Sequence, residues 1–161
     1  CMPEPTYTYT YLEYIQDIEI ITTKLKDIQH LHLVAIYRGS LPTTTHLSNL
    51  LNCDFSIIKI QTRDGNDDEA SFIHNDIKPE SNVVVIEDIY DSGKTIRLIK
   101  QIMKPYKSVK YLCLYGNKND DGVEYLREQL GRWIIFPHEI TLKELSRHDK
   151  HIPEYWKPEN N

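Results

Sequence analysis

The chain has 161 residues, enough for one domain with a substantial core and few for two. Its 24 acidic residues outnumber the 19 basic ones and the formal net charge is −5, which disfavours a general nucleic-acid-binding protein. The 3 cysteines show no C-x-x-C spacing, so we expect a reduced, cytoplasmic protein without a disulfide framework or a zinc site. No apolar run is long enough to span a membrane and no signal-peptide pattern is present, so we expect no membrane partner.

The first part of the chain predicts a helix, a strand and a second helix. Thr10 followed by Glu13 is a capping-box pattern, and the apolar residues after it recur at helical spacing, which predicts a helix over residues 11–28. Residues 31–36 form a short apolar run that is typical of a buried strand. A loop with Gly and Pro follows, and residues 43–51 are predicted to be helical.

The middle of the chain predicts the centre of a sheet. Residues 55–60 predict a strand, whereas residues 61–80 carry much charge and no apolar period, which is typical of an exposed linker or a mobile active-site lid. The consecutive β-branched residues 83–86 predict a strand that is buried on both faces. Apolar residues at helical spacing follow over residues 95–103.

The last part of the chain continues the alternation of strands and helices. Residues 109–115 predict a buried strand, followed by a polar, turn-rich loop. Residues 123–130 predict a short helix, residues 133–136 a final strand and residues 142–147 one more helical turn. The order of elements predicts an α/β fold, a mostly parallel twisted sheet flanked by helices.

The densest group of chemically active residues lies where the strand over residues 83–87 should end. In chain order these residues are Glu87, Asp88, Asp91, Ser92, Gly93, Lys94 and Thr95. A strand, a small polar loop and a helix N-terminus together present backbone N–H groups to a phosphate. Gly93-Lys94 invites comparison with a P-loop, but Asp88 stands where a P-loop needs its first glycine, so a P-loop is not predicted.

The whole pattern resembles the phosphoribosyl-diphosphate (PRPP) binding signature of the type I phosphoribosyltransferases. The resemblance implies a 5-phosphate held by loop N–H groups and by the hydroxyls of Ser92 and Thr95. It implies that Glu87 and Asp88 lie beside the ribose hydroxyls or the water shell of a Mg²⁺ ion that binds with PRPP. In 6-oxopurine relatives the carboxylate at the place of Asp91 lies near N7 of the purine and is the proposed general base or acid.

A second motif, Arg38-Gly39-Ser40, follows a predicted strand and precedes a predicted helix. It resembles the pyrophosphate loop of the same family, usually Arg-Gly-Gly, with Ser40 in place of the second glycine. The resemblance implies that Arg38 donates hydrogen bonds to the leaving pyrophosphate and that Gly39 lets the backbone approach closely. The peptide bond at that glycine or beside it is often cis in the family.

A third group resembles the base-binding end of the bacterial and archaeal hypoxanthine, guanine and xanthine phosphoribosyltransferases. The resemblance implies that Lys118 donates to the purine 6-oxo group, that Trp133 stacks on the ring and that the backbone of Ile134 meets the other edge of the base. Glu139 takes the place of an acidic residue near Mg²⁺ and pyrophosphate; this residue and the two strand-end carboxylates are expected to reach the metal mostly through water. From the residues alone, Trp133 as a core aromatic and Lys118 as a solvated loop lysine remain alternatives.

The resemblance predicts a single domain over residues 1–161, with a core over about 10–115, a hood over about 116–150 and a surface tail over 151–161. Residues 61–76 correspond to the loop that closes over the site in this family. The implied activity is transfer of the phosphoribosyl group from Mg²⁺-PRPP to a 6-oxopurine, giving a nucleoside monophosphate and pyrophosphate in purine salvage. A homo-oligomer, either dimer or tetramer, is expected. The alternatives are a pyrimidine or orotate phosphoribosyltransferase and a non-catalytic regulator that senses PRPP or nucleotides.

Overall fold

The computed structural model of the chain describes residues 5–63 and 67–141. The chain divides into two compact units: Ile15–Leu130, here the large unit, and Cys1–Tyr14 with Gly131–Asn161, here the small unit. In chain order the elements are β1 (Thr6–Thr8), α1 (Tyr11–Leu25), β2 (Leu31–Tyr37), α2 (Leu41–Leu51), β3 (Phe55–Arg63), β4 (Asp67–His74), β5 (Asn82–Ile89), α3 (Lys94–Met103), β6 (Val109–Gly116), β7 (Val123–Glu128) and β8 (Trp133–Ile135).

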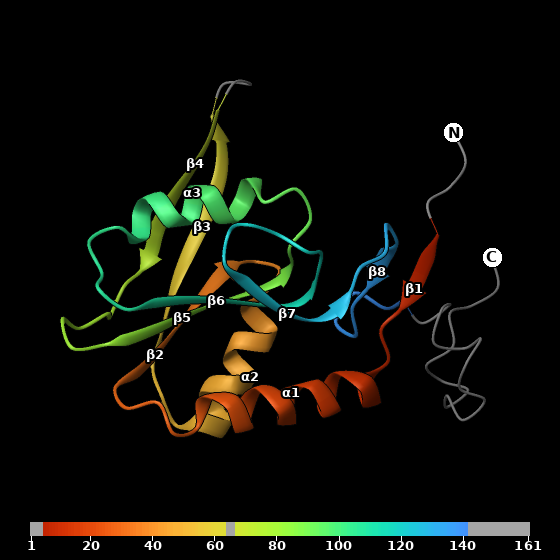
Figure 1. The fold of residues 1–161 in the computed structure, drawn as a ribbon, viewed down its shortest axis with the longest axis horizontal. Helices are drawn as coiled ribbons and strands as arrows, with labels where there is room; N and C mark the ends of the chain where they lie inside the picture. Colours follow the sequence, from red (N-terminus) through yellow and green to blue (C-terminus); the bar gives the residue numbers. More distant parts are fainter. Residues whose placement is uncertain (1–4, 64–66, 142–161) are drawn as a thin grey trace. The chain divides into compact units, whose positions relative to one another are not determined.

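The large unit is built on a 6-stranded sheet with the strand order β4-β3-β2-β5-β6-β7. Every neighbouring pair in this sheet is parallel except β3 and β4. The helix α3 covers one face of the sheet, and α2 covers the other together with the later part of α1 (Figure 1). The predicted α/β fold with a mostly parallel sheet is confirmed.

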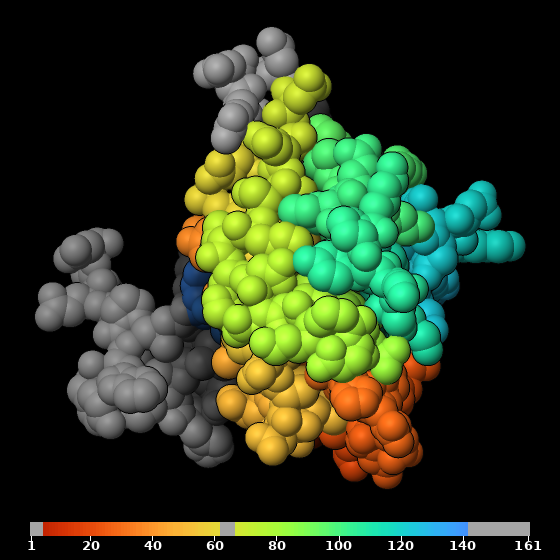
Figure 2. Space-filling model, turned by 90° about the vertical axis from the view of Figure 1, so that its left-hand side faces the viewer, coloured from red at the N-terminus to blue at the C-terminus, as the bar shows by residue number. Residues whose placement is uncertain are grey.

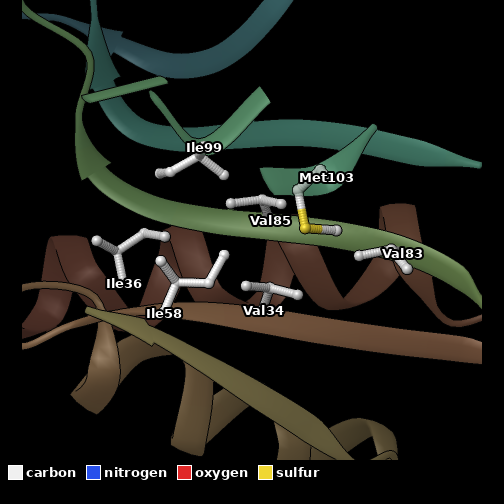
Figure 3. Packing of buried hydrophobic residues seen from close by; sticks show 7 residues of the cluster. All are labelled: Val34, Ile36, Ile58, Val83, Val85, Ile99 and Met103. Carbon is white, nitrogen blue, oxygen red and sulfur yellow. The ribbon is translucent and has the colours of Figure 1, made fainter. Parts of the chain in front are cut away.

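The main hydrophobic core of the large unit lies between the sheet and α3 (Figure 3). The strands β2, β3 and β5 supply it with residues from one face, because successive side chains of a strand point to opposite faces. The buried members are Val34, Ile36, Ile58, Val83, Val85, Ile99 and Met103. Burial of each such side chain contributes about 1.5–3 kcal/mol, so this cluster holds α3 firmly against the sheet.

The charged segment 61–80 contains the end of β3 and all of β4, so the prediction of an exposed linker is wrong for residues 61–63 and 67–74, whereas the alternative of an active-site lid stays a prediction. β4 pairs with β3 in the antiparallel direction. Along β4, Asp68, Ala70 and Phe72 are partly buried and the residues between them are exposed. Ala70 and Phe72 pack against the core, so the alternation typical of a strand was present but lay among charged residues. Figure 2 shows β4 alongside α3 on one face of the molecule.

Most of the segment 123–130 is the strand β7, Val123–Glu128, so the predicted helix is wrong. β7 pairs with β6 in the parallel direction and forms one edge of the sheet. Val123, Leu126 and Leu130 have a spacing that suits a helix, which explains the error. In the structure Val123 instead belongs to a buried cluster with Ile96 of α3, and Tyr125 packs against this cluster.

The small unit contains a second, parallel strand pair. β1 pairs with β8, with Thr6 opposite Trp133. β8 was predicted, but β1 was not, because it is short and lies in a tyrosine-rich stretch without a clear period. The fully buried rings of Tyr9 and Phe136 meet edge to face with centroids 5.8 Å apart, a favoured arrangement of aromatic rings.

The predicted capping box at the start of α1 is confirmed. The backbone N–H of Glu13 donates to Oγ1 of Thr10 at 3.1 Å, and the N–H of Thr10 donates to Oε1 of Glu13 at 3.0 Å. Of the helices that the structure describes, none is long and apolar enough to cross a membrane. The helical turn predicted over residues 142–147 lies outside the described residues.

Candidate functional site

The carboxyl ends of β2 and β5 form the place where this sheet is best able to hold a ligand. The two strands are neighbours, and the chain leaves them in opposite directions, to β3 through α2 and to β6 through α3. Open α/β sheets bind their ligands at such a switch point. The two loops found there are the two phosphate motifs predicted from the sequence, residues 38–40 after β2 and residues 88–95 at the end of β5.

The two loops meet at Gly39 and Asp88. A Cβ atom added to Gly39 would lie 2.7 Å from Oδ2 of Asp88, so a side chain at this position would collide with the carboxylate. The structure therefore brings the predicted pyrophosphate loop against the predicted ribose motif. Arg38 is exposed, so its guanidinium is accessible to an anion on this edge of the sheet.

Ser40, the departure from the usual Arg-Gly-Gly, stabilises the loop itself. Its backbone has φ −95° and ψ 3°, a conformation that does not require glycine. Its hydroxyl accepts a hydrogen bond from the backbone N–H of Ile36 at 2.8 Å, and the residue is fully buried as the N-cap of α2. The peptide bond between Tyr37 and Arg38 is cis, as the resemblance led us to expect for this loop.

The two carboxyl groups at the end of β5 have different surroundings. Glu87 is buried and accepts a hydrogen bond from the backbone N–H of Asp88 at 2.9 Å. Burial, and then the neighbouring Asp88 carboxylate, raise the pKa of Glu87 well above its usual value, which favours the protonated acid. Asp88 is only partly buried and faces Gly39, so Asp88 is the carboxyl presented to the two loops.

Oxygen donors of the kind that Mg²⁺ prefers are thus present at the end of β5. The carboxylate of Asp88 lies at the edge of the loops, and Glu87 offers a second carboxylate once it loses its proton. These residues fit a hydrated Mg²⁺ ion bound together with a phosphorylated ligand. Among the described residues, no group of three or more His, Cys, Asp or Glu side chains is placed to hold a metal ion.

The N-terminus of α3 offers a place for a phosphate group. Gly93 is the N-cap and has φ +84°, the left-handed region that favours glycine. Residues 89–96 enclose a small hollow of about 70 Å³. The first turn of a helix has N–H groups without helical partners, so this hollow suits an anion. Asp91 and Ser92 are exposed beside it, and Thr95 is half-buried.

Lys94 is the first residue of α3, but its ammonium group points towards β4. Its Nζ lies 3.0 Å from Oδ2 of Asp68 on β4, while the side chain stays 71% exposed. Such an exposed ion pair is weak, so a phosphate at the N-terminus of α3 would compete with Asp68 for Lys94.

Lys118 is exposed in the loop between β6 and β7, and this loop is ordered by asparagine side chains. Asn119 donates to the carbonyl groups of Asn117 and Val123 at 2.9 and 3.1 Å. Asn117 donates to the carbonyl of Tyr90 at 3.3 Å. The structure therefore brings the loop that carries Lys118 into contact with the loop at the end of β5.

The other residues predicted to bind the base or metal lie in the small unit. Trp133 is 61% exposed, so the alternative of a core aromatic is wrong, whereas Ile134 is buried. Glu139 accepts a hydrogen bond from the backbone N–H of Phe136 at 3.2 Å and donates its own N–H to the same residue's carbonyl. Trp133, Ile134 and Glu139 thus belong to one unit and the PRPP motif to the other.

Three residues that sequence reasoning missed surround Gly93: Tyr90, Arg97 and Asp121. Arg97 is an ordinary charged residue on the exposed side of a predicted helix, and Asp121 lies in a polar turn. Neither pattern signals a shared position, because only the fold brings the turn after β6 next to the start of α3.

The fold and the site define a protein of the open α/β class with two loops, both predicted to bind phosphate groups, at its switch point. The sequence profile of the phosphoribosyl transferase domain family matches residues 14–143. This match covers most of the chain, so the chain belongs to the phosphoribosyl transferase family. No curated protein sequence is matched.

Solved structures of the same fold include enzymes acting on different purines. A purine phosphoribosyltransferase from Pyrococcus horikoshii has a TM-score of 0.70 and 23% identity, with 84% of this chain and 95% of that chain covered. A xanthine-guanine-hypoxanthine phosphoribosyltransferase from Helicobacter pylori has a TM-score of 0.70 and 23% identity, covering 89% and 99%. An adenine phosphoribosyltransferase from Giardia lamblia has a TM-score of 0.62 and 12% identity, covering 74% and 81%.

Proposed function

We propose that the protein transfers the phosphoribosyl group from Mg²⁺-PRPP to a 6-oxopurine base: hypoxanthine, guanine or xanthine. The observation that supports this most directly is the meeting of the Gly39 loop with Asp88, next to the N-terminus of α3. PRPP carries a 5-phosphate at one end and a pyrophosphate at C1, so it needs two anion-binding loops with ribose-binding carboxylates between them. The switch point offers this arrangement within the large unit.

The 5-phosphate would lie in the hollow of residues 89–96, held by backbone N–H groups, by the Ser92 hydroxyl and by Thr95. The pyrophosphate would lie against residues 38–40, where the exposed Arg38 donates to it. Because Gly39 has no side chain, the ribose hydroxyls would have room beside Asp88.

Mg²⁺, when bound with PRPP, neutralises charge on the pyrophosphate, and Asp88 and Glu87 would hold it, mostly through water. The deprotonation of Glu87 that this requires is opposed by its burial in the ligand-free protein, so binding of the ion and loss of the proton should be linked.

The reaction forms a bond from a purine nitrogen to C1 of the ribose and breaks the bond from C1 to the pyrophosphate oxygen, which leaves with the electron pair. The transition state has oxocarbenium character, so stabilisation of the departing negative charge by Arg38 matters more than a strong nucleophile. The exposed Asp91, at the mouth of the phosphate loop, would accept the proton that the purine releases.

Specificity for a 6-oxopurine rests on Lys118 and Trp133. An exposed ammonium on an ordered loop suits a donor to the 6-oxo group, and an exposed indole suits stacking on a purine. Ile134 would meet the other edge of the base with its backbone. The purine enzymes from Pyrococcus horikoshii and Helicobacter pylori are similar in fold, which is compatible with a purine substrate.

The test is pyrophosphate release from Mg²⁺-PRPP with hypoxanthine, guanine, xanthine, adenine, uracil and orotate offered separately. Turnover with one or more 6-oxopurines alone is the expected result. Turnover with adenine or a pyrimidine would retain the phosphoribosyl site and contradict the roles given to Lys118 and Trp133. Binding of PRPP without turnover of any base would favour the non-catalytic regulator.

A further inference from the structure

Three polar side chains converge on Gly93 at the N-terminus of α3. The hydroxyl of Tyr90 donates to Oδ2 of Asp121 at 2.5 Å, and Nη2 of Arg97 lies 3.4 Å from the same oxygen. A Cβ atom added to Gly93 would lie 2.6 Å from the Tyr90 hydroxyl oxygen and 2.8 Å from both Nη2 of Arg97 and Oδ2 of Asp121. The three side chains therefore pack directly on the residue that begins α3.

Further hydrogen bonds join this group to α3 and to the predicted phosphate motif at the end of β5, residues 88–95, here called the phosphate loop. Nη2 of Arg97 also donates to the carbonyl of Ser92 at 3.1 Å. Nζ of Lys100, one turn further along α3, donates to the backbone carbonyl of Asp121. Tyr90 is buried and the Asp121 side chain is 19% exposed, so water competes only weakly for the bond between them.

Asp121 belongs to the same loop as Lys118. This loop joins the parallel strands β6, which ends at Gly116, and β7, which begins at Val123. Parallel neighbours usually need a connection of a dozen or more residues, so this short connection depends on strong anchoring. Asn119 anchors its middle, and Asp121 anchors its end on Tyr90 and Arg97.

We propose that Asp121 is a positioning residue that holds the phosphate loop and the Lys118 loop at one spacing. A ligand with both a phosphate and a base could then contact the phosphate loop and Lys118 at the same time. This inference rests on the proposed function, because it takes Lys118 as the residue that binds the base. Asp121 itself touches no substrate: it acts through Tyr90 on Gly93, and through the backbone on Lys118.

The electrostatics of the pair agree with this role. The hydrogen bond from Tyr90 holds the pKa of Asp121 below its usual value, and the same bond raises the pKa of Tyr90. The carboxylate therefore stays charged and the phenol stays protonated at neutral pH. A charge-assisted bond of this kind is stronger than a neutral one, which suits an anchor between two loops.

The test compares two ligands by isothermal titration calorimetry on the full chain. Ribose 5-phosphate spans the phosphate loop alone, whereas guanosine or inosine monophosphate spans the phosphate loop and the base loop. For Asp121→Ala we expect the affinity for ribose 5-phosphate to fall about fivefold and that for the nucleotide about fiftyfold, the effect of losing a hydrogen bond to a charged group. Tyr90→Phe removes one hydroxyl only and should give the same ranking with smaller factors, about threefold and tenfold.

Two further variants separate positioning from general damage. Asp121→Asn keeps an oxygen that can accept from Tyr90 but loses the charge, so it should recover part of both affinities. Asp120→Ala removes the same charge from an exposed neighbouring residue and should leave both affinities unchanged. Equal losses for the two ligands, or no loss in folded Tyr90→Phe protein, would overturn the inference.

The outcome of this test is distinct from that of the proposed function. A wild-type protein that binds ribose 5-phosphate but no purine nucleotide would contradict the proposed function by itself. The ribose 5-phosphate series would then decide the remaining claim, and an unchanged affinity in Asp121→Ala would show that Asp121 does not order the phosphate loop.

Discussion

Among the described residues of the large unit, two carboxyl groups are buried, one between α1 and β7 and one at the end of β5. Asp17 on α1 is 3% exposed, and Arg127 of β7 donates to it twice, Nε to Oδ2 at 2.6 Å and Nη2 to Oδ1 at 3.1 Å. Glu87 on β5 is 6% exposed, and no Lys, Arg or His among the described residues forms an ion pair with it. The energetic cost of burying a negative charge is thus offset by the Arg127 cation at Asp17. At Glu87 it is avoided by protonation, which the raised pKa of Glu87 favours.

The difference separates a carboxyl group that is balanced by a cation of the chain from one that is not. An unpaired buried carboxyl destabilises a fold, and such groups collect at sites where a ligand or metal later compensates them. Asp17 has its compensation within the chain, so nothing further is required of it. Glu87 has only its proton as compensation, and it lies at the switch point of the sheet. The exposed fractions of the two groups are similar, so the partner distinguishes them and burial does not.

The largest effect is expected from removing the partner of Asp17. Arg127→Met removes the guanidinium that forms an ion pair with the buried Asp17 carboxylate, which should lower the free energy of unfolding by about 3 kcal/mol. The side chain of Arg127 is 31% exposed, so water relieves part of the effect and a larger value is not expected. Urea unfolding followed by circular dichroism measures the change.

The control is an exposed ion pair that connects the same two elements, α1 and β7. Lys24 of α1 pairs with Glu124 of β7 at 3.3 Å, with side chains 47% and 63% exposed. Lys24→Met should cost less than about 1 kcal/mol, because exposed ion pairs are weak. Similar losses for both variants would mean that burial of Asp17 does not control the energy of its pair.

The sequence was sufficient for the parts of this comparison that depend on local pattern. The capping box located the start of α1, and the β-branched run located β5 and the loop after it. The strand–loop–helix arrangement around residues 88–95 was also local, since these elements follow one another directly, and phosphate binding by this loop stays a prediction.

The rest depends on contacts between distant residues. Asp17 and Arg127 are 110 positions apart, so no local pattern signals their ion pair. The segment that holds Arg127 was predicted as a helix, because its apolar spacing fits a helix and only its pairing with β6 selects a strand. The burial of Glu87 likewise follows from the neighbouring strands, since a residue at a strand end could equally be exposed.

The next effect concerns the loop that faces the Glu87–Asp88 pair. Gly39→Ala places a methyl group 2.7 Å from Oδ2 of Asp88, so the loop or the carboxylate must move. We expect the affinity for Mg²⁺-PRPP to fall about thirtyfold, since a small displacement of positioning groups strongly weakens a preorganised site. Calorimetric titration with Mg²⁺-PRPP measures this.

Gly131→Ala is the matched control for that substitution. Gly131 has φ +65° but nothing within 4 Å of an added Cβ atom, so the methyl group strains the backbone without meeting a neighbour. It should lower the free energy of unfolding by about 1 kcal/mol and leave Mg²⁺-PRPP affinity unchanged. Unchanged affinity in Gly39→Ala would show that the contact between Gly39 and Asp88 does not shape the site.

The last effect, and the most specific, is expected from Glu87→Gln, and its size depends on the pH. Because the pKa of Glu87 is raised in the folded protein, the folded state binds a proton that the unfolded state has lost. Folding therefore requires uptake of a proton, and the free energy of unfolding falls as the pH rises from the unfolded pKa, about 4.3, towards the raised folded pKa. Glutamine has a similar shape and no proton to lose, so Glu87→Gln should gain stability relative to wild type by about 1.4 kcal/mol for each pH unit in that window.

The difference is obtained from the free energies of unfolding of the wild type and of Glu87→Gln, measured between pH 4 and pH 8 in the presence of EDTA to remove metal ions. Asp17→Asn provides the contrast, because Asp17 already has a cation and its amide variant loses an ion pair, so it should be less stable than wild type throughout. A Glu87→Gln difference that stays constant with pH would mean that Glu87 is ionised in the folded protein. The two buried carboxyls would then differ in their partners but not in their charge, and Glu87 would need a cation other than those described to balance it.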